Sequence, residues 1–367
     1  MTSASTEHQG PTTTAPAAKF SLRGFAPGWG AAVMGTSVIS TIFTALREAG
    51  VLPEATSALA TVFLVLALGV GVIVLGLTTA RWVRYPSAAR ADLAHPVKGG
   101  MSATFGGGFL TLAVALGRSG QSLFGEPATV ALVAIFAAIG GALALIFGVA
   151  FLSRIFARGD TPAPAITGAW FIPPVVTIVI PTALAPLIHT GDLLARELLW
   201  VSWIALGMGG MLYLAITAVL IFRSATSPLP PAQLAPSLLI GMGPAGLIGL
   251  NLTLLTDASV RAGVASTDIV PVAEFAGLAV WGFGLWWAIA GLAVLKRGYQ
   301  RLPFSVASWG FTFPLGAWTV AGIVLGSRLD SSLVLGLGVV GAIVLIVLWL
   351  VLAWRTFRGI SSGSIWE

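Results

Sequence analysis

Polar side chains that could hold a solute recur in five apolar segments of this chain, and each of these segments also carries prolines or glycines. They are hydroxyls and one amide: Thr36, Ser37, Ser102, Thr104, Thr177, Asn251, Ser308 and Thr312. Such groups donate hydrogen bonds without carrying charge. They suit a solute that needs donors but no tightly held counter-charge.

The groups that most enzymes use are scarce. The chain has no cysteine and only three histidines, which excludes a thiolate site and makes a dense metal cluster unexpected. The common zinc-protease, nucleophile-elbow and phosphate-loop motifs are absent. One dinucleotide-type glycine pattern, Gly241-Met-Gly243-Pro-Ala-Gly246, lies inside an apolar segment, so we interpret it as a kinked, closely packed helix. We therefore predict no catalytic residue, metal or cofactor, and no enzyme activity.

Composition indicates a lipid environment. Hydrophobic residues make up 57% of the 367 positions and charged residues only 9%, whereas a soluble domain carries roughly 25% charged residues. So few charges cannot cover a water-exposed surface. The net charge of +6 comes from short loops between apolar runs. We expect the bilayer, and no nucleic acid, as a partner.

Ten apolar runs are long enough to cross a bilayer, which requires about 20 helical residues. They cover residues 27–46, 57–80, 99–117, 128–152, 166–188, 198–222, 233–255, 275–295, 304–326 and 333–354. The sequence therefore predicts an all-α membrane protein with ten transmembrane helices. The transmembrane domain would cover residues 23–357, between a disordered cytoplasmic tail (1–22) and a short cytoplasmic C-terminal tail (358–367).

Basic residues predict the orientation. If the N-terminus is cytoplasmic and every run crosses, 14 of the 19 Lys and Arg residues lie on the cytoplasmic side. This bias is the usual determinant of topology. We expect a multi-pass protein of the plasma membrane with both termini in the cytoplasm.

The odd-numbered runs repeat. They begin near Pro27, Pro96, Pro164, Pro236 and Pro303, at intervals of 67 to 72 residues, which indicates a helical hairpin repeated five times. Odd runs also hold the expected helix kinks, at Pro173, Pro174, Pro181, Pro244 and Pro314. Broken helix is tolerated in a membrane only beside protein or water. We therefore predict an inner ring of kinked odd helices around a central pore and an outer ring of even helices.

The pore would favour anions. No charged residue lies near the middle of any run, which disfavours carboxylate-based proton relays and acid-ringed cation pores. Hydroxyl donors, the N-terminal ends of broken helices and basic loops all favour negative charge. His95 and Lys98 would lie at the cytoplasmic mouth, where His95 is either a pH-sensitive element or an ordinary residue at the start of a helix.

Several segments resemble the tellurite-resistance/dicarboxylate transporter family. They are Pro27-Gly-Trp-Gly-Ala-Ala-Val-Met-Gly-Thr36, His95-Pro-Val-Lys98, Trp170-Phe-Ile-Pro-Pro174, Pro236-Ser-Leu with Gly243-Pro-Ala-Gly246, and Trp309-Gly-Phe-Thr-Phe-Pro314. The family includes fungal malate permeases, sulfite efflux pumps and plant slow anion channels. The resemblance implies five hairpins around a pore in each subunit of a homotrimer. It also implies that Phe313 plugs the pore; packing beside Pro314 is the alternative role for this ring.

Transport of a small anion is therefore the leading expectation, with C4-dicarboxylates such as malate first. Sulfite or tellurite efflux, or a channel for nitrate or chloride, is the alternative. A membrane-embedded enzyme and a non-transporting receptor are distant alternatives, because we find no convergent titratable groups and no loop long enough for a binding domain.

Overall fold

The computed structural model describes residues 20–190 and 193–366, and within these ranges it contains helices, turns and loops but no strand. Ten helical stretches in the described residues are long and apolar enough to cross a membrane, which confirms the all-α prediction. The helices are α1 (Gly30–Glu48), α2 (Pro53–Arg84), α3 (Pro86–Ala94), α4 (Lys98–Ser102), α5 (Thr104–Ser119), α6 (Gln121–Phe124), α7 (Glu126–Arg158), α8 (Ile172–Leu184), α9 (Leu193–Thr226), α10 (Met242–Arg261), α11 (Ile269–Gly298), α12 (Thr312–Arg328) and α13 (Ser332–Ser362).

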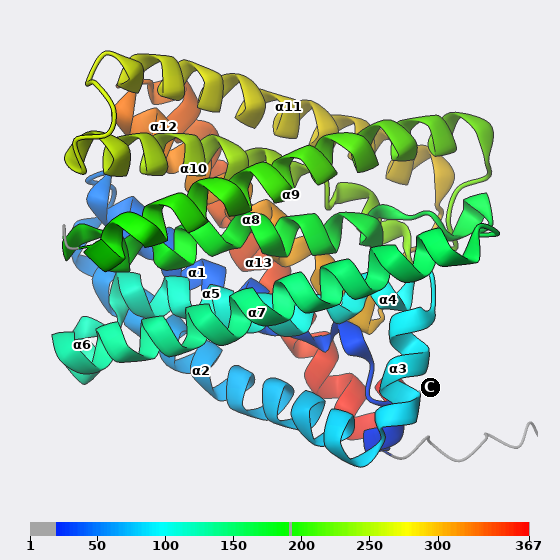
Figure 1. The fold of residues 1–367 in the computed structure, drawn as a ribbon. Helices are drawn as coiled ribbons and strands as arrows, with labels where there is room; N and C mark the ends of the chain where they lie inside the picture. The colour runs from blue at the N-terminus through cyan, green and yellow to red at the C-terminus, as the bar shows by residue number, and fades with distance from the viewer. Residues whose placement is uncertain (1–19, 191–192, 367) are drawn as a thin grey trace, which may run out of the picture.

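The long helices pack as hairpins (Figure 1). The partners are α1 with α2, α5 with α7, α8 with α9, α10 with α11, and α12 with α13. The first members also contact one another in a closed order, α1–α5–α8–α10–α12–α1. These five helices thus form a ring, which we call the inner ring.

The inner and outer helices differ in burial and length. The apolar cores of the inner spans are 72–100% buried, whereas those of α2, α7, α9, α11 and α13 are 22–44% buried. The outer helices therefore present most of their apolar side chains outward, where lipid would surround them. They are also longer, at 30–34 residues against 21–27 for the inner spans.

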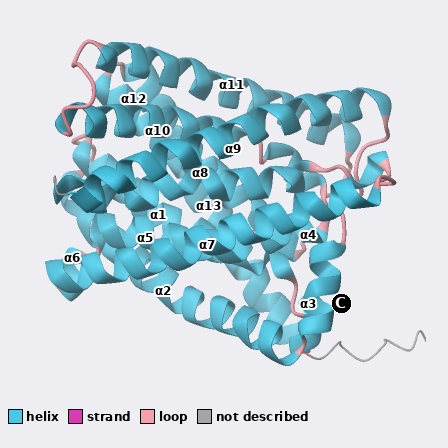
Figure 2. Cartoon of the chain, in the orientation of Figure 1, coloured by secondary structure: helices cyan, strands magenta, loops and turns pink. Residues whose placement is uncertain are grey.

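Each inner helix is preceded by a short helical segment (Figure 2). These are the 3₁₀ turns Pro27–Trp29, Gly168–Phe171, Ala235–Leu239 and Val306–Phe311, together with α4. Each contacts the next around the ring, so the five segments form a second closed circle at one end of the molecule. We call this circle the collar.

Some boundaries differ from the expected ones. The outer helices extend past the apolar runs, and α13 continues to Ser362, into the stretch expected to be a tail. Their ends carry arginines such as Arg84 and Arg158, whose long stems cover apolar surface while the charged heads reach the interface. Residues 1–19 of the expected N-terminal tail lie outside the described residues.

Candidate functional site

A small cavity of about 30 Å³ is enclosed by all five inner helices. Its lining, which we call the neck, consists of Val38, Thr41, Thr111, Val114, Val179, Thr182, Leu247, Leu250, Phe313, Ala317 and Val320. Each inner helix contributes a pair three positions apart, and residues at this spacing share one helix face. Successive pairs lie about 70 residues apart, which is the period of the repeat. The repeat thus places equivalent positions around one axis.

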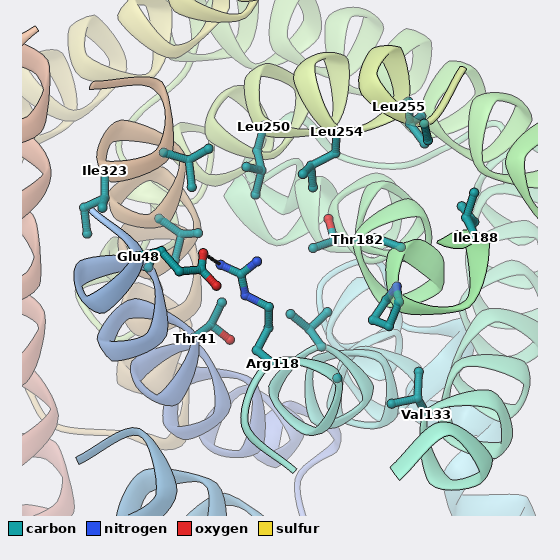
Figure 3. Close-up of a pocket in the computed structure, with 18 of the residues that line it drawn as sticks. Thr41, Glu48, Arg118, Val133, Thr182, Ile188, Leu250, Leu254, Leu255 and Ile323 are labelled. Atoms are coloured by element: carbon teal, nitrogen blue, oxygen red, sulfur yellow. Dashed lines mark hydrogen bonds and ion pairs between the residues drawn. The ribbon is translucent and has the colours of Figure 1, made fainter. Parts of the chain in front are cut away.

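A larger cavity of about 590 Å³ adjoins the neck and is shown in Figure 3. We call it the vestibule. It shares Thr41, Val114, Thr182, Leu250 and Val320 with the neck, so the two spaces lie next to each other. The vestibule is bounded by the C-terminal parts of the inner helices, at the end opposite the collar. Neck and vestibule together form a path from one end of the molecule toward Phe313.

The neck offers little to a hydrated ion. Seven of its side chains are Val, Leu or Ala. The hydroxyls of Thr41 and Thr111 donate to the carbonyls of Ser37 and Gly108, and that of Thr182 donates to Asn251 Oδ1. An ion here would lose its water without gaining a donor, which costs several kcal/mol. The neck is therefore narrow and mostly apolar.

Phe313 lies at the neck in the first turn of α12 and is 5% exposed. The backbone on either side of it is tightly seated. A Cβ at Gly35 of α1 would lie 1.9 Å from Thr312 Oγ1, and a Cβ at Gly243 of α10 would lie 2.7 Å from Pro314 Cα. The turn that carries the ring therefore cannot shift without opening these contacts, so rotation of the side chain is the freer motion.

The eight hydroxyl and amide residues expected to line the pore lie elsewhere. All are buried, yet none is among the residues that line the neck or the vestibule. Four of the hydroxyls, those of Ser37, Ser102, Thr177 and Thr312, donate to carbonyls three or four residues earlier in the chain. Bonds of this kind satisfy the hydroxyl locally, without a solute.

Of the other four, Thr36, Thr104 and Asn251 connect different parts of the chain, and Ser308 bonds within its own turn. Thr36 accepts from Trp349 Nε1 of α13, and Thr104 donates to the carbonyl of Pro27. Ser308 accepts from the Ser305 amide at the start of the collar turn. Asn251 donates to the Ile178 carbonyl and accepts from Thr182, so it supports a neck residue.

Four of the five prolines expected to kink helices lie where helices begin. Pro173, Pro174, Pro244 and Pro314 are in the first turns of α8, α10 and α12, where the missing N–H would have no partner in the helix. Pro181 alone lies inside a described helix. The breaks in the inner spans therefore fall at the junctions with the collar.

His95 and Lys98 lie at the collar end and line neither cavity. His95 Nδ1 accepts from the backbone amides of Val97 and Lys98, at 3.1 and 3.3 Å, so it caps the start of α4. Desolvation, followed by the positive charge of Lys98, lowers the pKa of His95, and the Asp92 carboxylate opposes this shift. A neutral ring that accepts two amides acts as a helix-starting residue.

Three arginines of the vestibule are functional candidates that the sequence analysis did not single out. Arg118, Arg261 and Arg328 lie in the last turns of α5, α10 and α12 and line the cavity. A positive charge there complements the helix dipole. The sequence does contain a pattern that could have identified them, because an arginine recurs in the last turn of four inner helices. Among the described residues no cluster of three metal-ligating side chains is found.

Comparisons with known proteins identify the family of this chain. The model of the voltage-dependent anion channel family matches residues 24–357. An uncharacterized transporter of Methanocaldococcus jannaschii is 28% identical over 94% of this chain and 98% of its own length. A sulfite efflux pump of Arthroderma benhamiae is 26% identical over 89% of this chain and 88% of its own. A malic acid transport protein of Schizosaccharomyces pombe is 25% identical over 41% of this chain and 37% of its own length. These matches confirm the resemblance seen in the sequence, and the chain belongs to the voltage-dependent anion channel family.

Proposed function

We propose that this chain carries small anions across the membrane through the vestibule and neck, and that it is not an enzyme. The observation that carries the proposal is the neck itself, to which all five inner helices contribute equivalent side chains and which adjoins a vestibule. Membership of an anion channel family supports an anion as the solute.

The proposed substrates are C4-dicarboxylates such as malate. The vestibule volume of about 590 Å³ lies within the range of about 300–1,000 Å³ of small-molecule sites, and the malic acid transport protein is a relative over part of the chain. Sulfite or tellurite efflux is the second candidate. The likeness to sulfite efflux pumps over 89% of the chain supports it.

Phe313 is the proposed gate. Its ring lies at the neck among aliphatic side chains from the four other inner helices, and its backbone is held by Gly35 and Gly243. The quadrupole of an aromatic ring presents a positive edge, so a rotated ring would not repel a passing anion.

The proposed assembly is a homotrimer in the plasma membrane, with both termini in the cytoplasm and the vestibule facing outward. The trimer is implied by the family resemblance. The orientation follows from the bias of Lys and Arg toward loops at the collar end.

Reconstitution into liposomes tests the proposal. Purified protein should release entrapped malate faster than empty vesicles do, and a panel of malate, sulfite, nitrate and chloride would rank the substrates. We expect flux to follow an imposed membrane potential. Equal leak with and without protein for every anion in the panel would contradict the proposal.

A further inference from the structure

One ion pair, between Arg118 and Glu48, is formed by two residues that line the vestibule (Figure 3). The Arg118 guanidinium extends from α5 into the cavity, and Glu48 meets it from the end of α1. Arg118 Nη2 donates to Glu48 Oε2 at 2.7 Å. This is the one hydrogen bond of the Arg118 side chain in the described part of the chain, and its Nε is buried without a partner. Most of the donors of this guanidinium are thus uncommitted.

The other two arginines of the vestibule differ from Arg118. Arg328 is held by two carboxylates, Asp257 at 2.7 Å and Glu274 at 2.8 Å, so its charge is more than compensated. Arg261 is exposed and forms no ion pair with any described residue. Arg118 alone combines a position inside the cavity with a single carboxylate held by a single hydrogen bond.

The vestibule has no general excess of positive charge. Its three arginines face the carboxylates of Glu48 and Glu126 in the lining, and Asp257 and Glu274 bind Arg328 from beside it. The C-terminal ends of the inner helices add partial negative charge. An anion that arrives here is therefore not drawn in by the field of the whole cavity and needs one specific cation.

We propose that Arg118 is the anion-binding residue of the vestibule and that Glu48 is an intramolecular competitor for it. The ligand is a small carboxylate or oxyanion, whose paired oxygens match the planar fork of a guanidinium. It binds by taking the place of the Glu48 carboxylate on Nη2 and engaging the free donors of Arg118. Competition from Glu48 thereby sets the anion concentration at which Arg118 is half-occupied. This inference rests on the proposed function and identifies the capture site of the same path.

A purely structural role for Arg118 gives a different expectation. The residue lies in the last turn of α5, where a positive charge stabilises the helix end through the helix dipole. In that role, neutralising Glu48 would alter stability slightly and would not change the concentration dependence of flux. Anion affinity therefore separates the two roles.

The test measures flux against anion concentration in liposomes, with stabilisation of the detergent-purified protein by added malate or sulfite as an independent binding readout. Glu48→Gln should lower the half-saturating concentration roughly twofold to fivefold, the upper part of the range expected when a partly exposed ion pair is removed. Arg118→Gln should raise it. In the Arg118→Gln background, Glu48→Gln should have no effect.

Glu126→Gln is the matched control, because it removes the same charge from the same cavity but has no ion pair with Arg118 among the described contacts. It should change the half-saturating concentration less than about twofold. If Arg118→Gln does not fold, Arg118→Lys keeps the charge and loses the fork, and should weaken binding of oxyanions more than of chloride.

Equal effects of Glu48→Gln and Glu126→Gln would overturn the proposal, and so would a Glu48→Gln effect that persists without Arg118. The failure of the transport function has a different signature. Wild-type liposomes would then show no flux, while malate or sulfite would still stabilise the protein in a manner that depends on Arg118 and Glu48. Absence of both flux and stabilisation would remove both proposals.

Discussion

The two ends of the inner ring differ in the kind of contact that forms them. At the vestibule end, side chains enclose a cavity of about 590 Å³ that includes charged groups from α1, α5, α7, α10 and α12. At the collar end, backbone meets backbone. A Cβ at Gly30 would lie 2.3 Å from the carbonyl oxygen of Thr104, and one at Gly168 would lie 1.8 Å from that of Ser237. One end can rearrange by rotating side chains, whereas the other cannot move without separating its segments.

Phe313 stands where these two regions meet. It belongs to the neck, yet its helix begins at the collar turn Val306–Phe311. The rigid end therefore holds the backbone of the proposed gate, and the ring lines the neck. This contrast indicates that opening involves the side chains of the neck while the collar stays fixed.

Phe313→Ala should give the largest effect, on anion conductance, because it would remove the ring that separates the vestibule end of the neck from the collar end. If the ring closes the neck, its removal should raise anion conductance of reconstituted protein by roughly tenfold or more, since each 1.36 kcal/mol removed from a barrier is tenfold in rate. Selectivity for anions over Na⁺ should persist. The measurement is current or flux per reconstituted protein.

Ordinary packing of Phe313 predicts the opposite sign. Loss of a buried aromatic ring costs roughly 3–5 kcal/mol, so yield and flux would both fall. Ser308→Ala, in the preceding collar turn, should be mild and serves as the control. A well-folded Phe313→Ala protein with unchanged current would remove this residue from the gate.

Gly168→Ala should give the next largest effect, on stability rather than flux. The added methyl group would meet the Ser237 carbonyl at 1.8 Å, and the collar cannot yield locally because both groups are backbone. Overpacking typically costs about 1–3 kcal/mol, so the melting temperature in detergent should fall by several degrees. Gly76→Ala on α2, where nothing lies within 4 Å, should leave it unchanged or raise it. Equal tolerance at both glycines would show that the collar is pliable.

Protonation of His95 should give the smallest effect. Because its pKa is lowered in the folded protein, the neutral ring contributes stability that is fully present above the unfolded pKa of about 6.5 and is lost as pH falls through the folded pKa. His95→Ala should cost about 0.5–2 kcal/mol, the usual value of a cap. It should also flatten the decline of melting temperature below pH 6.5.

His95→Asn separates capping from titration. An Asn side chain accepts a backbone amide but carries no proton that is lost near neutral pH. This variant should recover much of the stability of the wild type while remaining insensitive to pH. A pH dependence unchanged in both variants would assign it to other groups.

The architecture could be predicted from the sequence because the buried inner helices and the lipid-facing outer helices alternate at a regular spacing along the chain. The prolines that precede the inner helices recur every 67 to 72 residues, and apolar length alone marks the outer helices. Apart from Phe313, sequence reasoning did not reach the lining of the neck. Ser37, Thr104 and Thr312 attracted attention because they are polar, but a hydroxyl in a membrane helix can satisfy itself on a nearby carbonyl. Polarity therefore does not report which face of an inner helix meets the axis.

Alignment of the five repeats with one another would have served better. The neck pairs that begin at Val38, Thr111, Val179, Leu247 and Ala317 lie roughly 11 to 15 residues beyond the five leading prolines, or three to four helical turns. Equivalent positions in a closed repeat must converge on its axis. The ion pair of Arg118 and Glu48 could not be read in this way, because it joins two repeats through side-chain geometry.

The lengths of the outer helices have a consequence for how the protein responds to its membrane. At a rise of about 1.5 Å per residue, the 34 residues of α9 span about 50 Å, well beyond a hydrocarbon core of about 30 Å. Helices this long meet a change in bilayer thickness by tilting or by exposing their ends, at fractions of a kcal/mol per ångström. The inner helices are shorter and largely screened from lipid, so thinning or thickening of the bilayer would be absorbed at the periphery before it reached the neck.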